Sequence, residues 1–365
     1  MRKIVPDLTK ELLKHFGNVK NVGTAEPFLV KSFRELVEHT AKLSFQNKDN
    51  LLFYRGQVED YPNKGGSSSF YPSIYRGDYL PLRELKNRFD ILEGTGKALA
   101  DLFETNKIQG YEELKKRKSI RWSILQHYGV CETPLMDFTQ SLRVACSFAT
   151  IEKKEFGYVF IFGLPYLTNR VSINSEHDII NVRLLSICPP TALRPYFQEG
   201  YLAGTDEITD NYESKSELDF NYRLIAKFKF KNNKYFWGDK FGEIPESLLY
   251  PEGDPINELC KQIKSFSDKQ LKSGDLGDFL KSWAELEEKL LLKARIDNRR
   301  FLSLNEAIRY LFNQGLIDNE QLNLIDALRR YRNKLVHTPH KMTSNEIRKY
   351  FSFLDQAHKA LAKKG

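Results

Sequence analysis

The spacing of apolar residues divides the chain into two parts with different patterns. Up to about residue 260, segments with helical spacing alternate with short apolar runs typical of strands, such as LLFY at 51–54 and YVFIF at 158–162. From residue 279 onward only helical spacing remains, and Leu280, Trp283, Leu286 and Leu290 fall on one side of the first helix. The pattern predicts an α+β N-terminal domain followed by an all-α four-helix bundle.

The charged, glycine-containing stretch SDKQLKSGDLGDFLK (267–281) has the composition of a linker. We therefore expect an N-terminal helical extension (1–29), an α+β domain (30–263), a linker (264–278) and a helical bundle (279–365). In the α+β domain the pattern predicts helices at 25–48, at 80–106 with an interruption at Gly94 and Gly96, at 120–129, and from Thr139 or Ser141. It also predicts two short strands within 183–205 and a further strand at 223–230. On that last strand the alternation places Lys227 and Lys229 on a solvent-exposed face.

Composition narrows the partners and the compartment. The 365 residues carry a formal net charge of +8, which suits an anionic partner such as nucleic acid or a nucleotide. No window reaches the roughly 18 apolar residues that a membrane span needs, so we expect a cytoplasmic protein with no membrane partner. The four cysteines lie far apart without a CxxC pair, which indicates free buried thiols and no metal site.

Three separated segments carry candidate chemistry: FYRGQ at 53–57, LQHYGVCETPLMDFTQSLRVACSFA at 125–149, and FQEGYL at 197–202. Together they resemble the FRG domain, which is named for a Phe/Tyr-Arg-Gly motif, over residues of about 30 to 263. The chain departs from the usual family sequence at Cys131-Glu132-Thr133, where proline-threonine-arginine is common.

The order of these segments is also similar to ADP-ribosyltransferases of the arginine–serine–glutamate type. That resemblance implies a split, mixed or antiparallel sheet with helices, and NAD as the candidate cofactor. Arg55 would contact the ribose or phosphate of NAD, Asp137 to Thr139 would replace the serine–threonine–serine element, and Gln198 or Glu199 would lie near the catalytic glutamate. A neutral Gln198 amide cannot stabilise positive charge on the ribose, and Glu199 on the same strand would face the opposite side.

The candidate nucleotide-binding or second catalytic site therefore consists of eight residues: Arg55, Gly56, Gln57, His127, Asp137, Thr139, Gln198 and Glu199. Structural alternatives stand beside this interpretation. Arg55 would form an ion pair with Asp137, His127 would be a hydrogen-bonded core histidine, and Thr139 would be a helix N-cap. For Thr139 alone, we favour the N-cap.

Near the C-terminus, RRYRNKLVHTPH (329–340) contains Arg332, Asn333 and His337, which resemble the signature of HEPN domains. Many HEPN domains are metal-independent ribonucleases that act as dimers with both motif copies in one cleft. The resemblance implies that Arg332 holds the RNA phosphate and that His337 acts as general acid or base. Asn333 and His337 are four residues apart and share a helix face, whereas Arg332 and His337 do not. The alternative is an inert dimerisation module.

The resemblances to the FRG, ADP-ribosyltransferase and HEPN families imply two hypotheses for the whole chain. In the first, it is a two-domain bacterial effector of the anti-phage defence or toxin type, in which the FRG domain binds a nucleotide and the HEPN-like bundle cleaves RNA. In the second, the FRG domain is an active ADP-ribosyltransferase-like module and the bundle only forms a homodimer. A non-catalytic binding protein is a third alternative. The transferase hypothesis requires that Arg55, Asp137, Thr139 and Gln198 converge on one cleft.

Overall fold

The computed structural model describes residues 1–77, 82–205, 214–239, 241–267, 273–294, 303–337 and 344–362. The chain divides into two compact units, Met1–Lys264 and Ser265–Gly365. Helix α11 (Pro255–Ser267) and helix α12 (Ser273–Ala294) occupy the described part of the stretch that we expected as a linker, and residues 268–272 lie outside the described residues.

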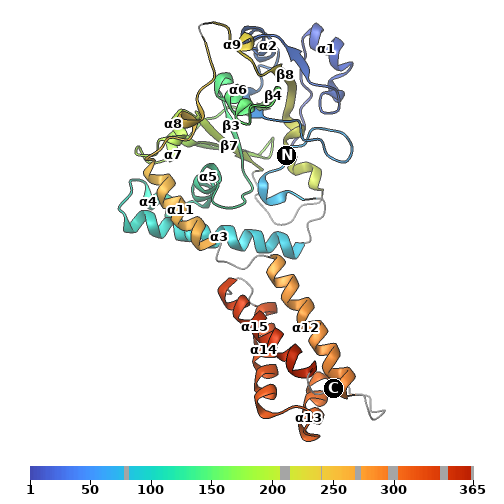
Figure 1. Cartoon of the computed structure of the whole chain (residues 1–365). Coiled ribbons are helices and arrows are strands. Elements are labelled where there is room, and N and C mark those ends of the chain that lie inside the picture. Colours follow the sequence, from blue (N-terminus) through green and yellow to red (C-terminus); the bar gives the residue numbers. More distant parts are fainter. Residues whose placement is uncertain are drawn as a thin grey trace. The chain divides into compact units, whose positions relative to one another are not determined.

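The first unit contains an eight-stranded mixed sheet in its described residues (Figure 1). In spatial order the strands are β1 (Phe28–Val30), β8 (Leu224–Lys231), β4 (Phe156–Leu164), β2 (Leu51–Gln57), β3 (Met136–Thr139), β7 (Gly200–Gly204), β6 (Ile179–Arg183) and β5 (Val171–Asn174). Strands β1 and β8 are parallel, and every other neighbouring pair is antiparallel. The predicted α+β class is confirmed.

The middle of this sheet has a weak seam. Strand β2 pairs with β4 over its whole length, from Leu51 to Gln57, but it pairs with β3 only at Tyr54 and Thr139. Two groups of four strands are therefore joined at the seam by one residue pair. Beyond that pair the backbone groups of β2 and β3 do not bond to each other, so side chains have room to enter between the strands.

Helices cover the sheet and build two apolar cores in the first unit. One core joins β1, β2, β3, β4 and β8 to α1 (Lys10–Phe16), α2 (Phe33–Gln46) and α6 (Leu142–Thr150). The other core joins β6 and β7 to α3 (Leu82–Thr105), α4 (Tyr111–Lys116), α5 (Lys118–His127) and α11. Short helices complete the unit: α7 (Leu184–Ile187), α8 (Arg194–Phe197), α9 (Lys234–Trp237), α10 (Glu246–Leu249), and the 3-10 turns Val19–Asn21, Ser73–Tyr75, Lys215–Leu218 and Phe220–Arg223. The segment expected as an N-terminal extension supplies α1 and the start of β1.

Helix α6 packs so closely on β2 that position 56 has no room for a side chain. A Cβ atom on Gly56 would lie 1.7 Å from the main-chain oxygen of Ala145 in α6. The glycine that follows Arg55 therefore allows the helix to lie directly on the strand. This contact places the start of α6, and with it the loop after β3, next to Arg55.

Several local predictions were wrong for identifiable reasons. The helix expected from residue 25 begins at Phe33, because strand β1 precedes it. Helix α3 runs through Gly94 and Gly96 without interruption, and a Cβ on Gly96 would lie 3.3 Å from Nε of Arg121 in α5, so this glycine serves close helix packing. Of the two strands expected within 183–205 only β7 forms there as a separate strand, and α7 takes the place of the other. In contrast, the predicted end of helix α5 at Gly129 is confirmed, since the helix ends at His127 and Gly129 has a φ of +61°.

The expected wet face of β8 is also wrong, because Lys227 is only 2% exposed. Its ammonium group donates to the main-chain oxygen of Gly23 at 2.9 Å and to Ser68 Oγ at 2.8 Å, and it forms an ion pair with Asp60 at 2.9 Å. Three acceptors satisfy the three donors of the ammonium group, which makes burial of the charge tolerable. Lys227 thereby ties the loop after β2 to the sheet.

The second unit is all-α in its described residues. It contains α12, α13 (Leu304–Asn313), α14 (Asn319–His337) and α15 (Ser344–Ala362). Buried side chains of all four helices form one apolar core, which includes Phe279, Leu311, Leu328 and Leu354. The rings of Tyr331 and Tyr350 stack with centroids 3.6 Å apart, which fixes α14 against α15.

Candidate functional site

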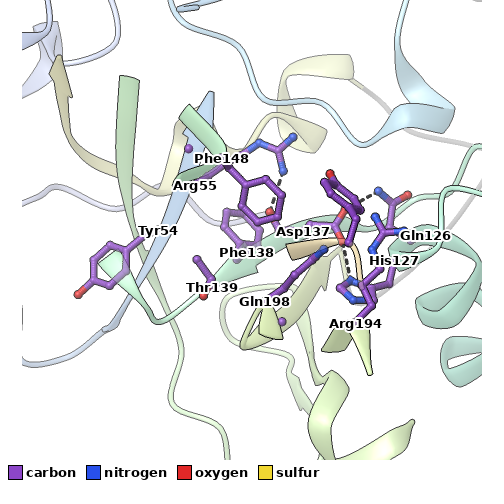
Figure 2. Close-up of a pocket in the computed structure, with 13 residues that line it drawn as sticks. Tyr54, Arg55, Gln126, His127, Asp137, Phe138, Thr139, Phe148, Arg194 and Gln198 are labelled. Atoms are coloured by element: carbon purple, nitrogen blue, oxygen red, sulfur yellow. Dashed lines mark hydrogen bonds and ion pairs between the residues drawn. The ribbon is translucent and has the colours of Figure 1, made fainter. Parts of the chain in front are cut away.

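A pocket of about 210 Å³ opens at the seam between β2 and β3. Figure 2 shows side chains from β2, α5, β3, α6 and α8 around it. The lining residues are Tyr54, Arg55, Gly56, Gln126, His127, Asp137, Phe138, Thr139, Phe148, Arg194, Gln198, Gly200 and Tyr250. Six of the eight residues predicted for this site thus converge, and Gln57 and Glu199 are not among those that line the pocket.

Arg55 crosses the seam with its guanidinium group. Nη1 donates to the main-chain oxygen of Asp137 at 2.7 Å, and Nε is buried without a partner (Figure 2). Among the described residues no ion pair joins Arg55 to the Asp137 carboxylate, so the expected structural ion pair is not what holds it. Burial lowers the pKa of Arg55, and the nearby Asp137 charge partly opposes this shift.

The carboxylate of Asp137 is held on both oxygens. Gln126 Nε2 donates to Oδ2 at 2.6 Å, and His127 Nδ1 lies 3.4 Å from Oδ1 (Figure 2). Burial alone would raise the pKa of Asp137, but the hydrogen bonds from His127 and Gln126 and the charge of Arg55 lower it below its ordinary value. Asp137 is therefore an anion in the folded protein, and two neighbouring side chains hold its carboxylate.

His127 is the last residue of α5 and is 3% exposed. Burial lowers its pKa, while the hydrogen bond with Asp137 acts in the opposite direction. The ring is thus neutral near pH 7, and the contact with a carboxylate assigns its proton to Nδ1. The alternative of a hydrogen-bonded core histidine accounts for Nδ1, which contacts Asp137. It does not account for Nε2, which is buried and has no partner.

Arg194 enters the pocket from α8. Its guanidinium carbon lies 4.6 Å from the centre of the Tyr250 ring and 5.5 Å from that of Tyr128, and its Nε is buried without a partner. Contact with the faces of two tyrosine rings holds the cation without a carboxylate. Figure 2 shows Arg194 beside His127, on the side of the pocket away from Tyr54.

We expected Gln198 and Glu199 on a strand, but neither residue lies on one. Gln198 follows the last turn of α8, and its Nε2 donates to the main-chain oxygen of Leu249 at 2.7 Å. Glu199 has a φ of +44°, is exposed, and forms the turn before β7 begins at Gly200. The amide therefore lines the pocket, and the carboxylate lies outside it.

The remaining predicted residues have local roles. Thr139 ends β3, and its Oγ1 accepts from the backbone N–H of Ser141 at 3.1 Å. The N-cap of α6 is Ser141, whose Oγ accepts from the backbone N–H of Val144, so the N-cap assignment for Thr139 was wrong. Gln57 is partly buried, and its Oε1 has no partner.

Sequence reasoning missed Gln126, Arg194 and the aromatic rings of the pocket. Gln126 stands beside His127 in the same motif, and its side chain points to the carboxylate that the histidine faces. Arg194 precedes Gln198 by four residues, a spacing that places both on one side of a helical turn. That spacing was a usable signal, but only if the segment was known to be helical.

The C-terminal motif is split between a second pocket and the solvent. Arg332 and Asn333 line a pocket of about 250 Å³ in the second unit, together with Trp283, Glu287, Ser303, Leu304, Asn305 and Arg329. Arg332 Nη1 donates to Asn333 Oδ1 at 3.0 Å, and Arg332 Nε is buried without a partner. His337 is the exposed last residue of α14 and is not among those that line this pocket.

Metal and membrane features are not found in the part of the chain that the structure describes. No cluster of three or more histidine, cysteine, aspartate or glutamate side chains there has the arrangement of a metal site. No described helix is long and apolar enough to cross a bilayer. All four cysteines are free thiols, and burial raises the pKa of Cys131 and of Cys260 to about 12.

Comparison with known proteins gives one result, for the part of the chain that holds the seam. No curated protein and no solved structure matches the chain. A family model described as the FRG domain matches residues 50–157, which carry Arg55, Gln126, His127 and Asp137. Arg194, Gln198 and Tyr250 come from outside the matched range and complete the same pocket. The chain therefore carries an FRG domain at residues 50–157.

Proposed function

We propose that the pocket at the β2–β3 seam binds a nucleotide through its phosphate groups. The observation that carries this proposal is the charge arrangement around the pocket. Arg55 and Arg194 each have a buried, unpartnered Nε and, among the described residues, no carboxylate within 4 Å. The lining carboxylate, Asp137, is already held by Gln126 and His127. A bound phosphate would supply the missing acceptors for the guanidinium groups.

The shape and the lining of the pocket support a nucleotide among the possible anions. Phe148 and Tyr250 supply aromatic rings on which a base or ribose packs, whereas the ring of Tyr54 points away from the pocket (Figure 2). A volume of about 210 Å³ is below the roughly 300–1,000 Å³ of pockets that enclose drug-sized ligands. The pocket therefore encloses the phosphate and sugar part of a nucleotide, and the rest of a larger molecule such as NAD lies outside it.

NAD is the specific candidate that the arrangement of Arg55, Asp137, Thr139 and Gln198 around one pocket supports. Transfer of ADP-ribose from NAD is a further step, because it needs a carboxylate beside the ribose. Glu199 is exposed outside the pocket, and the carboxylate available is that of Asp137. We therefore propose nucleotide binding as the function of the pocket, with ADP-ribosyl transfer through Asp137 as the alternative.

The direct test is calorimetric titration of the full chain with NAD, ADP and AMP. We expect Arg55→Ala and Arg194→Ala each to weaken the affinity by about tenfold or more, since a hydrogen bond to a charged group contributes about 1.5–3 kcal/mol. Arg34→Ala is the matched control, because it removes one positive charge from an exposed side chain on α2. Absence of binding by the wild type, or equal affinity in Arg55→Ala, contradicts the proposal.

The second unit has its own candidate function, metal-independent cleavage of RNA. The supporting observation is that Arg332 has a buried, unpartnered Nε in a pocket that it shares with Asn333. Because His337 lies outside that pocket, the proposal includes a homodimer in which His337 of one protomer meets Arg332 of the other. We expect Arg332→Ala and His337→Ala to abolish RNA cleavage and Arg330→Ala to retain it. Cleavage by a monomeric species, or by His337→Ala, contradicts this mechanism.

In a cell, single substitutions distinguish the contributions of the two sites through their effect on the toxicity of the expressed chain. A role as a cytoplasmic defence or toxin effector predicts that the wild type arrests growth when it is expressed. Rescue by Arg55→Ala alone assigns the arrest to the FRG pocket, and rescue by His337→Ala alone assigns it to the second unit. A wild-type chain that leaves growth unchanged contradicts the toxin role.

A further inference from the structure

A chain of hydrogen bonds leads from Thr133 to His127 beneath the pocket. The Thr133 hydroxyl donates to Gln126 Oε1, Gln126 Nε2 donates to Asp137 Oδ2 at 2.6 Å, and Asp137 Oδ1 faces His127 Nδ1 at 3.4 Å. Thr133 is fully buried and His127 is 3% exposed. The four residues come from α5, the loop after it, and β3, so the fold brings them together from within a segment of a dozen residues.

This chain fixes the orientation of each group in turn. The Asp137 carboxylate can only accept, so it holds the NH₂ group of Gln126 toward itself and leaves Oε1 to accept from the Thr133 hydroxyl. The Asp137 carboxylate in turn holds the proton of His127 on Nδ1. What remains is Nε2, an unprotonated ring nitrogen that is buried and has no partner. It belongs to a side chain that lines the same pocket as Arg55 and Arg194.

We propose that the pocket hydrolyses a phosphate ester or anhydride of its nucleotide, with His127 Nε2 as the general base. This inference rests on nucleotide binding at the same pocket. In the step, a water O–H bond breaks and the proton moves to Nε2, while the water oxygen forms a bond to phosphorus and the bond from phosphorus to the leaving oxygen breaks. The leaving oxygen then takes the proton from Nε2, so the histidine returns to its neutral form. Asp137 is a positioning residue that stabilises the transient imidazolium.

The groups around the pocket favour reaction at phosphorus over reaction at the ribose C1′ atom. Cleavage of a glycosidic bond needs a free carboxylate to stabilise positive charge, and both oxygens of Asp137 are engaged. Displacement at phosphorus develops negative charge on the phosphoryl oxygens, which Arg55 and Arg194 would stabilise. Displacement at phosphorus requires cationic groups and a neutral base. The pocket supplies two guanidinium groups without a carboxylate partner and one neutral histidine.

The pH dependence of the reaction follows from the groups that face His127. These are Asp137 from β3, Arg194 from α8, Asp254 at the start of α11, and the ring of Tyr128. Burial has the largest effect and lowers the pKa of His127. The hydrogen bond with Asp137 raises this pKa, and the positive charge of Arg194 lowers it further. Hydrolysis therefore stays at its plateau at pH values below the ordinary 6.5 of histidine and falls only in more acidic solution.

The experiment follows hydrolysis of ATP, ADP, ADP-ribose and NAD by the full chain in water enriched in ¹⁸O, with ³¹P NMR as the readout. We expect ¹⁸O in the phosphate product of at least one of these nucleotides. His127→Gln should lower kcat by roughly 100-fold or more while nucleotide affinity stays, since Arg55 and Arg194 are unchanged. Asp137→Asn should lower the plateau and move the acid limb to lower pH, because the imidazolium loses its counter-charge. Thr133→Val keeps the shape of the side chain and removes only its hydroxyl, so it should lower kcat without changing KM.

Each alternative outcome is decisive. If the wild type binds a nucleotide but hydrolyses none of the four, this inference fails while nucleotide binding stands. If the wild type binds none of them, nucleotide binding fails first. If folded His127→Gln, checked by its circular dichroism and melting temperature, hydrolyses at the wild-type rate, or if the acid limb of Asp137→Asn does not move, His127 is not the base.

Discussion

The guanidinium group of Arg55 donates to the main-chain oxygen of Asp137 at the point where β2 and β3 stop pairing. A backbone carbonyl that would bond to a neighbouring strand in a continuous sheet bonds to a side chain instead. Arg55 thereby closes the sheet at the seam and presents its remaining N–H groups to the pocket. This bond gives the arginine a structural role, and the binding role that we propose for it is separable from the structural one by substitution.

Substitution of Arg55 by lysine separates those roles. The lysine ammonium group keeps the charge and one bond to the Asp137 carbonyl, but it loses the planar fork that binds two phosphate oxygens. We expect Arg55→Lys to lower the free energy of unfolding by no more than about 1 kcal/mol and to weaken nucleotide binding by about tenfold. Denaturant titration and calorimetry measure the two quantities. Loss of stability without loss of affinity would show that Arg55 only closes the sheet.

Gly56 is expected to be intolerant of any side chain. A methyl group at this position would lie 1.7 Å from the Ala145 carbonyl oxygen, and neither backbone is free to move away because α6 packs along β2. Overpacking of this kind costs about 1–3 kcal/mol or more, so we expect Gly56→Ala to lower the urea midpoint clearly. Gly242→Ala in the same unit is the control, because a Cβ added to Gly242 would have no atom within 4 Å among its described surroundings. Equal midpoints for the two variants would show that α6 can shift.

The buried Lys227 gives a second stability prediction. Lys227→Met leaves Asp60 in the loop after β2 without its ion pair, and removal of one partner from a buried pair costs about 3–5 kcal/mol. Lys229→Met is the matched control, since Lys229 lies two residues further along the same strand and pairs with the exposed Glu26. Its cost should not exceed about 1 kcal/mol. Guanidinium denaturation of both variants measures the difference.

Stability should depend on pH through His127 and Asp137. His127 has a lowered pKa in the folded state, so the unfolded chain takes up the proton first as pH falls below the ordinary 6.5, and the free energy of unfolding then declines. Asp137 also has a lowered pKa, so its contribution is present above the ordinary value near 3.9 and is lost as pH falls through its folded-state value.

Denaturant titrations between pH 4.5 and pH 8 measure the histidine contribution. We expect His127→Gln to have a smaller decline below pH 6.5 than the wild type. His177→Gln is the comparison, because burial lowers the pKa of that histidine too and it should account for part of the decline. An unchanged pH slope in His127→Gln would show that His127 is protonated as easily in the folded protein as in the unfolded chain.

Tyr250 should matter for the pocket mainly through its ring. Arg194 lies over the ring face at 4.6 Å, a contact that phenylalanine preserves, although phenylalanine loses the hydrogen bond between the Tyr250 hydroxyl and Arg194. We expect Tyr250→Phe to lose less nucleotide affinity than Tyr250→Ala, which should lose about fivefold to tenfold because Arg194 is then no longer held in place. Isothermal titration of the two variants is the measurement. Equal losses in both would assign the contribution to the hydroxyl group instead.

The sequence predicted the parts of the fold and site that depend on local pattern. Apolar runs located β2 and β4, and the resemblance brought Arg55, His127 and Asp137 together although they come from three separate elements. Prediction failed where tertiary contacts decide. Alternation alone puts Lys227 on a wet face, and only the fold brings Asp60 to meet it, while Arg194 lies in a helix of one turn that no periodicity reveals. Glu199 was placed on a strand because the resemblance to ADP-ribosyltransferases implies one there, whereas its φ of +44° makes it part of the turn before β7.

The single Tyr54–Thr139 pair at the seam has a mechanical consequence. Met136 and Phe138 of β3 belong to the same apolar core as β2 and β4, so side chains as well as this one backbone pair join the two groups of strands. Arg55 lies in one group, whereas His127 and Arg194 pack against the other. A nucleotide bound by these three side chains, as we propose, would act as a non-covalent cross-link between the two groups of strands. Its binding would add to the free energy of unfolding, so the occupied sheet should resist opening at the seam more than the empty sheet does.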